Sequence, residues 1–356
     1  MSNKKLKTQN NSKTRKNKKN NNSKTRKNQK RVELPNVSLL KKLCSIHSPS
    51  GQEEKTMDFL VNYVKTHKHS WAVQPKVIHN DDLKNNLILV FGKNPKNVIM
   101  MHMDSIGYIY AGENSKLYRI GGVQHINKAK LRGFTPDNKE IHTEVKMKKD
   151  INNGNNNNGF NHKNRKYPYP NKSDKIPIGT NLTFVPQWKE TNKAITASSL
   201  DNKVGVYLGL MLAKTLKSGI LVFTGGEEEP HANSIKYITK LLYDTYKIKN
   251  VIIMDTTTPT ETTKKGRGST IVFRDYYLYK RAFLDYVLSL LPKKEVQIEV
   301  GVFGSSDMEG VLTSPYPINA AFLGTIISNI HSNKEHVYKS DILSTLKNIK
   351  ILMNKL

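Results

Sequence analysis

Cysteines and long apolar runs are scarce in this sequence. Cys44 is the single cysteine among 356 residues, which excludes an intramolecular disulfide framework and a zinc site built from several thiolates. No apolar stretch approaches the roughly 20 residues that span a bilayer, and the N-terminus lacks the apolar segment of a signal peptide. We therefore expect a soluble protein, without a membrane partner, in the reducing intracellular setting of the cytoplasm.

Acidic residues are also few, since 29 Asp and Glu stand against 58 Lys and Arg, a net charge of +29. Thirteen of the positive charges precede Glu33, the first acidic residue, which leaves 29 − 13 = +16 for the remainder. Residues 1–32 contain almost no apolar side chains, so we predict a disordered basic tail. Two interpretations stay open: an arm that contacts nucleic acid or another anionic partner, and a solvated extension without a partner.

After the tail, the pattern becomes that of a folded chain. Helical spacing appears near residues 39–46 and 48–67, followed by strand-like runs at 85–92 and 96–111. Beyond Asp201, predicted helices (204–217, 234–246, 277–291 and 340–356) alternate with predicted strands (219–225, 250–255, 296–301 and 319–325). This alternation predicts an α/β fold, a three-layer sandwich with a mostly parallel central sheet.

The segment between these two parts has a different composition. Short β-like pieces at 116–123, 140–147 and 181–186 are separated by Gly, Pro and Asn, and residues from about 151 to 171 form a low-complexity loop. We predict that residues 105–190 are a small β-rich domain, inserted into an α/β domain made of residues 33–104 and 191–356.

Candidate functional residues stand where the predicted strands end. His102 and Asp104, then Glu227 and Glu228, then Asp255, and finally His331 each follow an apolar run, and Asp201 stands at the start of a helix. In open α/β sheets, ligands bind at the carboxyl ends of the strands. Taken singly, each residue also fits a helix cap, a turn or a core histidine. Together they form the nitrogen and oxygen donor set expected for Zn²⁺ or a similar divalent ion.

Asp104 stands two residues after His102. Side chains two apart in a strand point to the same face, so Asp104 can accept the second ring N–H of His102 and fix its tautomer. We therefore assign Asp104 to the catalytic apparatus through its hold on His102.

Nine short motifs occur in the order seen in the tetrahedral and glutamyl aminopeptidases, which the chain resembles from about Leu39 to its C-terminus. The motifs are SGQEE (50–54), HMDSIG (102–107), IPIGTNLTF (176–184), SLDNKVG (199–205), FTGGEE (223–228), IIMDTT (252–257), KKGRGSTI (264–271), GSSDMEG (304–310) and IHSNKE (330–335). The resemblance implies a metallo-aminopeptidase with two divalent metal ions per subunit, zinc with cobalt as the alternative. It further implies peptide substrates and a homo-oligomer.

Residue roles also follow from the resemblance. It implies that His102, Asp201 and Asp255 hold one metal, that Asp201, Glu228 and His331 hold the other, and that Asp201 bridges the two. A carboxylate that is not a ligand must then move the proton of the attacking water, and we assign this role to Glu227. Of the three adjacent glutamates, Glu229 is expected to point elsewhere and to take no part in the chemistry.

Two other functions stay open at this point. The chain could be a catalytically altered peptidase scaffold whose basic tail binds nucleic acid or an anionic surface. It could also hydrolyse another amide, of the N-acyl or carboxypeptidase type, because the same metal chemistry serves those reactions.

Overall fold

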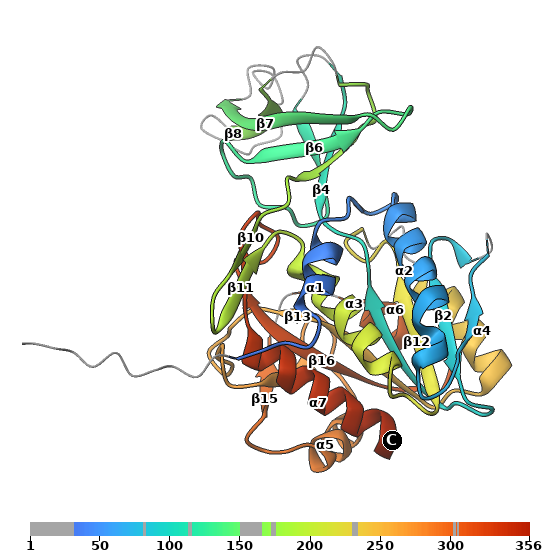
Figure 1. The fold of residues 1–356 in the computed structure, drawn as a ribbon. Coiled ribbons are helices and arrows are strands. Elements are labelled where there is room, and N and C mark those ends of the chain that lie inside the picture. The colour runs from blue at the N-terminus through green and yellow to red at the C-terminus, as the bar shows by residue number, and fades with distance from the viewer. Residues whose placement is uncertain are drawn as a thin grey trace, which may run out of the picture. The chain divides into compact units, whose positions relative to one another are not determined.

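The computed structural model describes residues 32–80, 83–112, 116–149, 166–171, 176–229, 234–301, 304 and 306–356. Apart from Val32, the predicted disordered tail lies outside the described residues. Most of the predicted low-complexity loop also lies outside them. Of the 11 strands in the larger sheet, four form its parallel centre (Figure 1). In order they are β12 (Gly219–Thr224), β3 (Asn97–His102), β13 (Asn250–Thr257) and β16 (Asn319–Ser328).

These central strands are almost continuous runs of buried residues. Such runs are typical of parallel strands that are covered on both faces. Helices α3 (Leu200–Ala213) and α7 (Lys339–Lys355) pack together on one face, and α4 (Ile235–Tyr246) and α6 (Met308–Leu312) lie on the other (Figure 1). The predicted α/β class with a parallel central sheet is therefore confirmed.

The margins of the large sheet are antiparallel. On one side β2 (Leu87–Phe91) pairs with β12 and with β1 (Lys76–Ile78). On the other side β16 pairs with β17 (Glu335–Tyr338), which is followed by β11 (Ala194–Ala197) and β10 (Trp188–Glu190). A branch is formed by β14 (Ser269–Arg274), antiparallel to β16, and β15 (Val296–Val300), parallel to β14. The remaining helices are α1 (Val37–Cys44), α2 (Glu54–His67), the short 3₁₀ helix η1 (Lys68–Ser70) and α5 (Arg281–Leu290).

A second sheet of six strands forms the β-rich part of the chain. Its order is β5 (Leu117–Ile120), β4 (Gly107–Tyr110), β9 (Asn181–Phe184), β6 (Lys130–Phe134), β7 (Glu140–Lys149) and β8 (Lys166–Pro170). The sheet encloses a hydrophobic core of its own, which includes Tyr108, Leu131 and Leu182. A separate core is what a small domain needs in order to be stable.

Two boundaries differ from the sequence-based expectation. Residues 166–170 were predicted to belong to the low-complexity loop, but they form β8, which pairs with β7. The alternating Tyr and Pro side chains of β8 suit a half-buried edge strand, where a missing N–H is tolerated. The large sheet also resumes at Trp188 rather than at residue 191, because β10 pairs with β11.

Candidate metal centre

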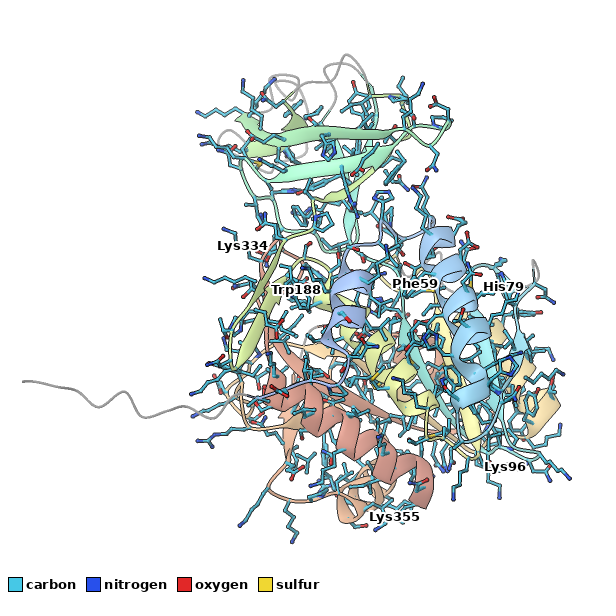
Figure 2. The ribbon with its side chains drawn as sticks, in the orientation of Figure 1. Phe59, His79, Lys96, Trp188, Lys334 and Lys355 are labelled. Atoms are coloured by element: carbon cyan, nitrogen blue, oxygen red, sulfur yellow. The ribbon has the colours of Figure 1, made fainter. Side chains whose placement is uncertain are left out.

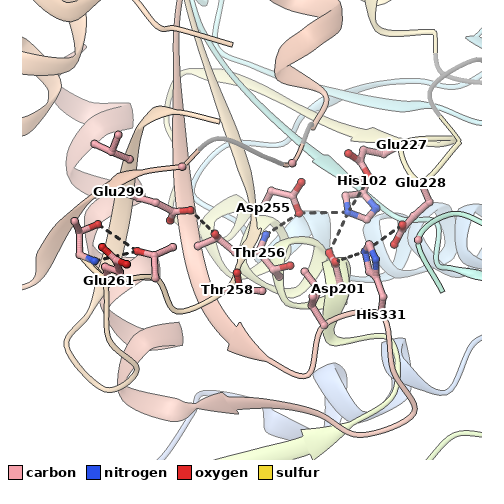
Figure 3. A pocket seen from close by; sticks show the side chains of 18 residues that line it. His102, Asp201, Glu227, Glu228, Asp255, Thr256, Thr258, Glu261, Glu299 and His331 are labelled. Carbon is pink, nitrogen blue, oxygen red and sulfur yellow. Dashed lines mark hydrogen bonds and ion pairs between the residues drawn. The ribbon is translucent and has the colours of Figure 1, made fainter. Parts of the chain in front are cut away.

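The ends of the central strands bring the predicted site residues together. His102 ends β3, Glu227 and Glu228 follow β12, and Asp255 lies near the end of β13. These three strands are parallel neighbours, so their carboxyl ends meet at one edge of the sheet. Figure 3 shows that the side chains converge on one end of a cavity.

Two groups of ligand atoms form at this edge. His102, Glu227 and Asp255 make one group, and Asp201, Glu228 and His331 make the other. Within each group the atoms lie within 4.8 Å of one another. All the donors are nitrogen or carboxylate oxygen, which suits a divalent ion such as zinc.

Asp201 lies between the two histidines. Its Oδ1 is 3.3 Å from Nε2 of His102, and its Oδ2 is 3.3 Å from Nε2 of His331. Each oxygen of one carboxylate therefore faces a different group. This is the arrangement that a bridging ligand requires.

Distances from His102 distinguish two carboxylates of the first group. Its Nε2 is 3.3 Å from Oδ1 of Asp255 and 3.7 Å from Oε2 of Glu227. On the other side, Nε2 of His331 is 3.3 Å from Oε2 of Glu228. The second oxygen of Glu228, Oε1, is buried and has no hydrogen-bond partner in the described part of the chain. A buried oxygen in this state is open to a cation.

The buried carboxylate of Asp104 contacts several residues of the site. Its Oδ1 is 3.3 Å from Nδ1 of His102, which places the two side chains side by side as predicted, but Nδ1 has no hydrogen-bond partner in the described part of the chain. The same carboxylate accepts hydrogen bonds from the backbone N–H groups of Glu227 (3.2 Å) and Glu228 (3.1 Å) and from the Ser50 hydroxyl (2.6 Å). Asp104 thus lies against the imidazole of His102 and fixes the turn that carries the two glutamates.

The glycine pair before the glutamates permits that turn. Gly226 has φ of +78°, a region that other residues rarely adopt. The third glutamate, Glu229, belongs to neither ligand group. Its Oε1 accepts a hydrogen bond of 2.7 Å from the backbone N–H of Gly121, in the segment that follows β5.

The segment after β5 also contacts the loop that carries His331. The backbone N–H of Gln124 donates to the carbonyl of His331 (2.9 Å), and its side-chain amide donates to the carbonyl of Ile330 (2.7 Å). A methyl group added at Gly122 would meet Nδ1 of His331 at 2.4 Å. The inserted β-rich segment therefore contributes to holding a candidate metal ligand.

Glu335 is a site residue that the sequence analysis did not single out. Its Oε1 accepts the backbone N–H of His331 (2.8 Å), and its Oε2 accepts the backbone N–H of Asp201 (3.1 Å). His331 has φ of +61°, so its backbone needs such support. The motif IHSNKE contains Glu335, but its residue type alone gave no sign of this role.

Asp307 is a second residue of this kind. It is buried, and its Oδ2 accepts a hydrogen bond of 2.5 Å from the Thr224 hydroxyl at the end of β12. Burial raises the pKa of Asp307 to about 7, and the charges of Asp255 and Asp104 add to the effect. Asp307 lies in the motif GSSDMEG, but the sequence analysis assigned it no role.

The electrostatics of the site favour bound cations. Burial, together with the neighbouring carboxylates Asp255 and Glu228, raises the pKa of Glu227 well above its usual range. Burial and the charge of Asp201 do the same for Glu228. Burial opposes ionisation of Asp201 as well, but hydrogen bonds from His102 and His331 hold its pKa low. Four carboxylates and two imidazoles converge here, so positive charge would relieve their repulsion.

Comparison with known proteins decides the family. A sequence profile for the M42 glutamyl aminopeptidases matches residues 169–347, just over half of the chain. The chain belongs to the M42 glutamyl aminopeptidase family. The matched region contains Asp201, Glu227, Glu228, Asp255 and His331. Membership in the M42 family confirms the predicted class of metal-dependent, hydrolytic aminopeptidase.

Solved structures show the same fold as this M42 chain. An aminopeptidase from the archaeon Desulfurococcus kamchatkensis is 20% identical, with a TM-score of 0.74 over 90% of this chain and 94% of its own. The TET1 peptidase of Pyrococcus horikoshii is 19% identical, with a TM-score of 0.70 over 90% and 99% of the two chains. A TET aminopeptidase from a marine-sediment thaumarchaeote is 12% identical, with a TM-score of 0.73 over 90% and 96%. A search of curated proteins found no match.

The membrane expectation was tested only for the described residues. None of their helices combines the length and the apolar character that crossing a bilayer would require. The prediction that the basic tail contacts nucleic acid concerns residues outside the described ranges, and the comparisons lend it no support.

Proposed function

We propose that this M42 chain removes N-terminal residues from peptides with the help of two divalent metal ions. His102, Asp201 and Asp255 would hold one ion, and Asp201, Glu228 and His331 would hold the other. The observation that carries the proposal is the placement of Asp201, whose two oxygens each lie 3.3 Å from a different histidine. The unpartnered, buried Oε1 of Glu228 also fits a metal ligand.

The ions, zinc or cobalt, would supply Lewis-acid activation of the scissile carbonyl and of a water, and a coordination site for the lone pair of the free, neutral α-amine. The protein must then move one proton. Glu227 suits this role because its carboxylate is farther from His102 than that of Asp255, 3.7 Å against 3.3 Å, and burial raises its pKa. It would take a proton from the water and give it to the amine nitrogen as the peptide C–N bond breaks.

The remaining residues act by positioning. Asp104 lies against the ring of His102 and holds the backbone of the two glutamates, so it would influence the reaction through them. Glu335 holds the backbones of Asp201 and His331. Fixed ligands of this kind keep reacting groups within the narrow geometry that catalysis needs.

We also propose that the chain assembles into a homo-oligomer. The support is its fold similarity to the Pyrococcus horikoshii TET1 peptidase, which is described as assembling into a tetrahedron or a large octahedral shell. Light scattering on the purified chain tests this directly. A mass equal to one chain at micromolar concentration would contradict it.

Metal analysis combined with an activity assay tests the proposed reaction. We expect about two divalent ions per chain and release of N-terminal residues from a panel of aminoacyl amides, with activity lost on chelation and restored by zinc or cobalt. His102→Ala should lose both metal and activity. His336→Ala is the matched control, because His336 lies in β17 and belongs to neither ligand group. Retained activity in His102→Ala would refute the assignment.

A further inference from the structure

The candidate active-site cavity extends well beyond the metal ligands. Its volume is about 740 Å³, and its lining continues from Asp255 along a series of threonines, which are Thr256, Thr257, Thr258, Thr260 and Thr262. Two acidic residues, Glu261 and Glu299, complete this part of the wall. In Figure 3 both lie on the side of Asp255 away from His102 and His331.

Glu299 is directed inward by the strand that carries it. Its neighbours in β15, Ile298 and Val300, are 44% and 53% exposed, whereas Glu299 is 8% exposed. Successive side chains of a strand point to opposite faces, so the alternation turns Glu299 away from solvent. It lines the same cavity as His102 and Asp255.

The carboxylate of Glu299 is only half satisfied. Its Oε1 accepts a hydrogen bond of 2.7 Å from the Thr257 hydroxyl, and its buried Oε2 has no hydrogen-bond partner in the described part of the chain. No basic side chain among the described residues forms an ion pair with it. Buried carboxylates are costly without a partner, so an unpaired one that lines an active-site cavity indicates a ligand.

The surroundings of Glu299 add negative charge. Burial raises the pKa of Glu299, and the nearby carboxylate of Asp275 raises it further, although the hydroxyls of Thr257 and Thr270 lower it. Asp275 is itself buried and accepts a hydrogen bond from the Tyr279 hydroxyl. With Glu261 on the same wall, this end of the cavity is electrostatically suited to a cation.

The distance from the metal ligands suits a long side chain. Thr257 stands two residues after Asp255 in β13, so the two share a face of the strand. A strand rises about 3.3 Å per residue, which places Thr257 about 7 Å along β13 from Asp255. A substrate whose α-amine lies at the ligand groups would reach Glu299 with the flexible stem of lysine or with the arginine guanidinium.

We propose that Glu299 forms the end of a specificity pocket for a cationic N-terminal side chain, so that the enzyme favours substrates beginning with lysine or arginine. This inference rests on the proposed function, since it assumes that the substrate amine lies at the metal ligands. An N-terminal glutamate would face like charge from Glu299, so the "glutamyl" in the family description does not describe the preference of this chain.

Matched substrates isolate the role of the charge. Norleucine amide differs from lysine amide by carrying a methyl group in place of the aminomethyl group at the end of its side chain. We expect kcat/KM for lysine amide to exceed that for norleucine amide by about 10- to 100-fold, the usual value of a hydrogen bond to a charged group. Glu299→Gln keeps an oxygen for Thr257 but removes the charge, and should bring the ratio close to one. Asp244→Asn, at an exposed acid on α4, should leave the ratio unchanged.

The outcomes separate the two proposals. If norleucine amide is hydrolysed and lysine amide is not preferred, or if Glu299→Gln keeps the wild-type ratio, the cationic pocket is refuted and the aminopeptidase assignment stands. If no amide is hydrolysed, the proposed function fails. The cationic pocket is then tested by calorimetry, which measures the binding of L-lysinamide and of L-norleucinamide to the zinc-loaded protein. Tighter binding of L-lysinamide would support the pocket. Equal affinities, or no binding of either compound, would overturn it.

Discussion

At the scale of single residues, three adjacent glutamates have three different environments. Glu228 belongs to the group with Asp201 and His331, Glu227 lies beside His102, and Glu229 accepts a hydrogen bond from Gly121. Asp104 produces this separation by holding the backbone N–H groups of Glu227 and Glu228. The chemical roles of the three side chains should therefore be separable by substitution.

We predict that Glu228→Ala loses bound metal, because it removes one ligand and the charge that attracts the ion. Glu227→Gln should keep about two ions per chain and lose turnover by about 100- to 10,000-fold, the usual contribution of a positioned general base. Metal analysis and kcat measured on the same preparations check both expectations. The matched control is Glu229→Gln, which should keep metal and most of the activity. Equal losses at all three positions would contradict the division of roles.

Sequence reasoning identified most of the ligand candidates because they follow apolar strands, whose ends can be recognised from periodicity, and it identified Asp201 at the start of a helix. It could not identify Glu335, whose two oxygens bind backbone N–H groups 134 and 4 residues away in the chain. Such a role depends on where two loops meet in space. Glu299 was missed for the same reason: its strand was predicted, but the hydroxyl of Thr257 comes from another strand.

At the scale of elements, the segment after β5 contacts the candidate metal centre. Gln124 binds the backbone of the His331 loop, and Gly122 lies against the imidazole. The sequence analysis separated the inserted residues from the catalytic ones and made no prediction about contacts between them. The difference arises because glycine and a backbone carbonyl carry no sequence signal for such a contact.

Gly122→Ala tests this contact. The added methyl group would stand 2.4 Å from Nδ1 of His331, closer than real carbon atoms approach. The imidazole ring of His331 must shift. We therefore predict that the variant binds the ion held by Asp201, Glu228 and His331 at least tenfold more weakly and loses activity in proportion. Zinc titration followed by calorimetry measures this change.

Gly179→Ala is the control for that experiment. Gly179 lies between β8 and β9 with φ of +83°, and a methyl group there meets no atom within 4 Å. The substitution should cost about 1 kcal/mol of stability because of its backbone conformation. It should leave zinc affinity unchanged. A Gly122→Ala enzyme with normal zinc affinity would show that the His331 ring is not held by this segment.

The elements that periodicity could not predict are mostly short marginal strands. β1, β10 and β17 contain three or four residues each, and each carries at least one charged side chain. Three residues are too few to establish a period of two, so their pairing partners decide that they are strands. The central strands were predictable because burial on both faces requires long apolar runs.

At the scale of the whole molecule, the buried side chain of His47 links the helices beside the large sheet to the six-stranded sheet. His47, between α1 and α2, is 2.9 Å through Nδ1 from the Thr183 hydroxyl of β9, and its ring meets Phe134 of β6 at 5.0 Å. Burial lowers the pKa of His47 to about 3, and the charges of Arg132 and Lys55 contribute to the same direction. Between the folded pKa of about 3 and the unfolded pKa of about 6.5, His47 is therefore neutral in the folded protein and protonated in the unfolded chain.

This depressed pKa predicts how stability depends on pH. The neutral form of His47 contributes its full stability above the unfolded pKa of about 6.5. That contribution is lost as the pH falls toward the folded value of about 3. The loss should approach about 1.4 kcal/mol per pH unit below 6.5.

Because His47→Gln cannot be protonated, its free energy of unfolding should fall less steeply between pH 6.5 and 4.5. Urea unfolding of both proteins at several pH values measures the difference, with His69→Gln, at an exposed histidine, as the control. Parallel pH curves for wild type and His47→Gln would show that burial of His47 does not set the acid limit of this enzyme.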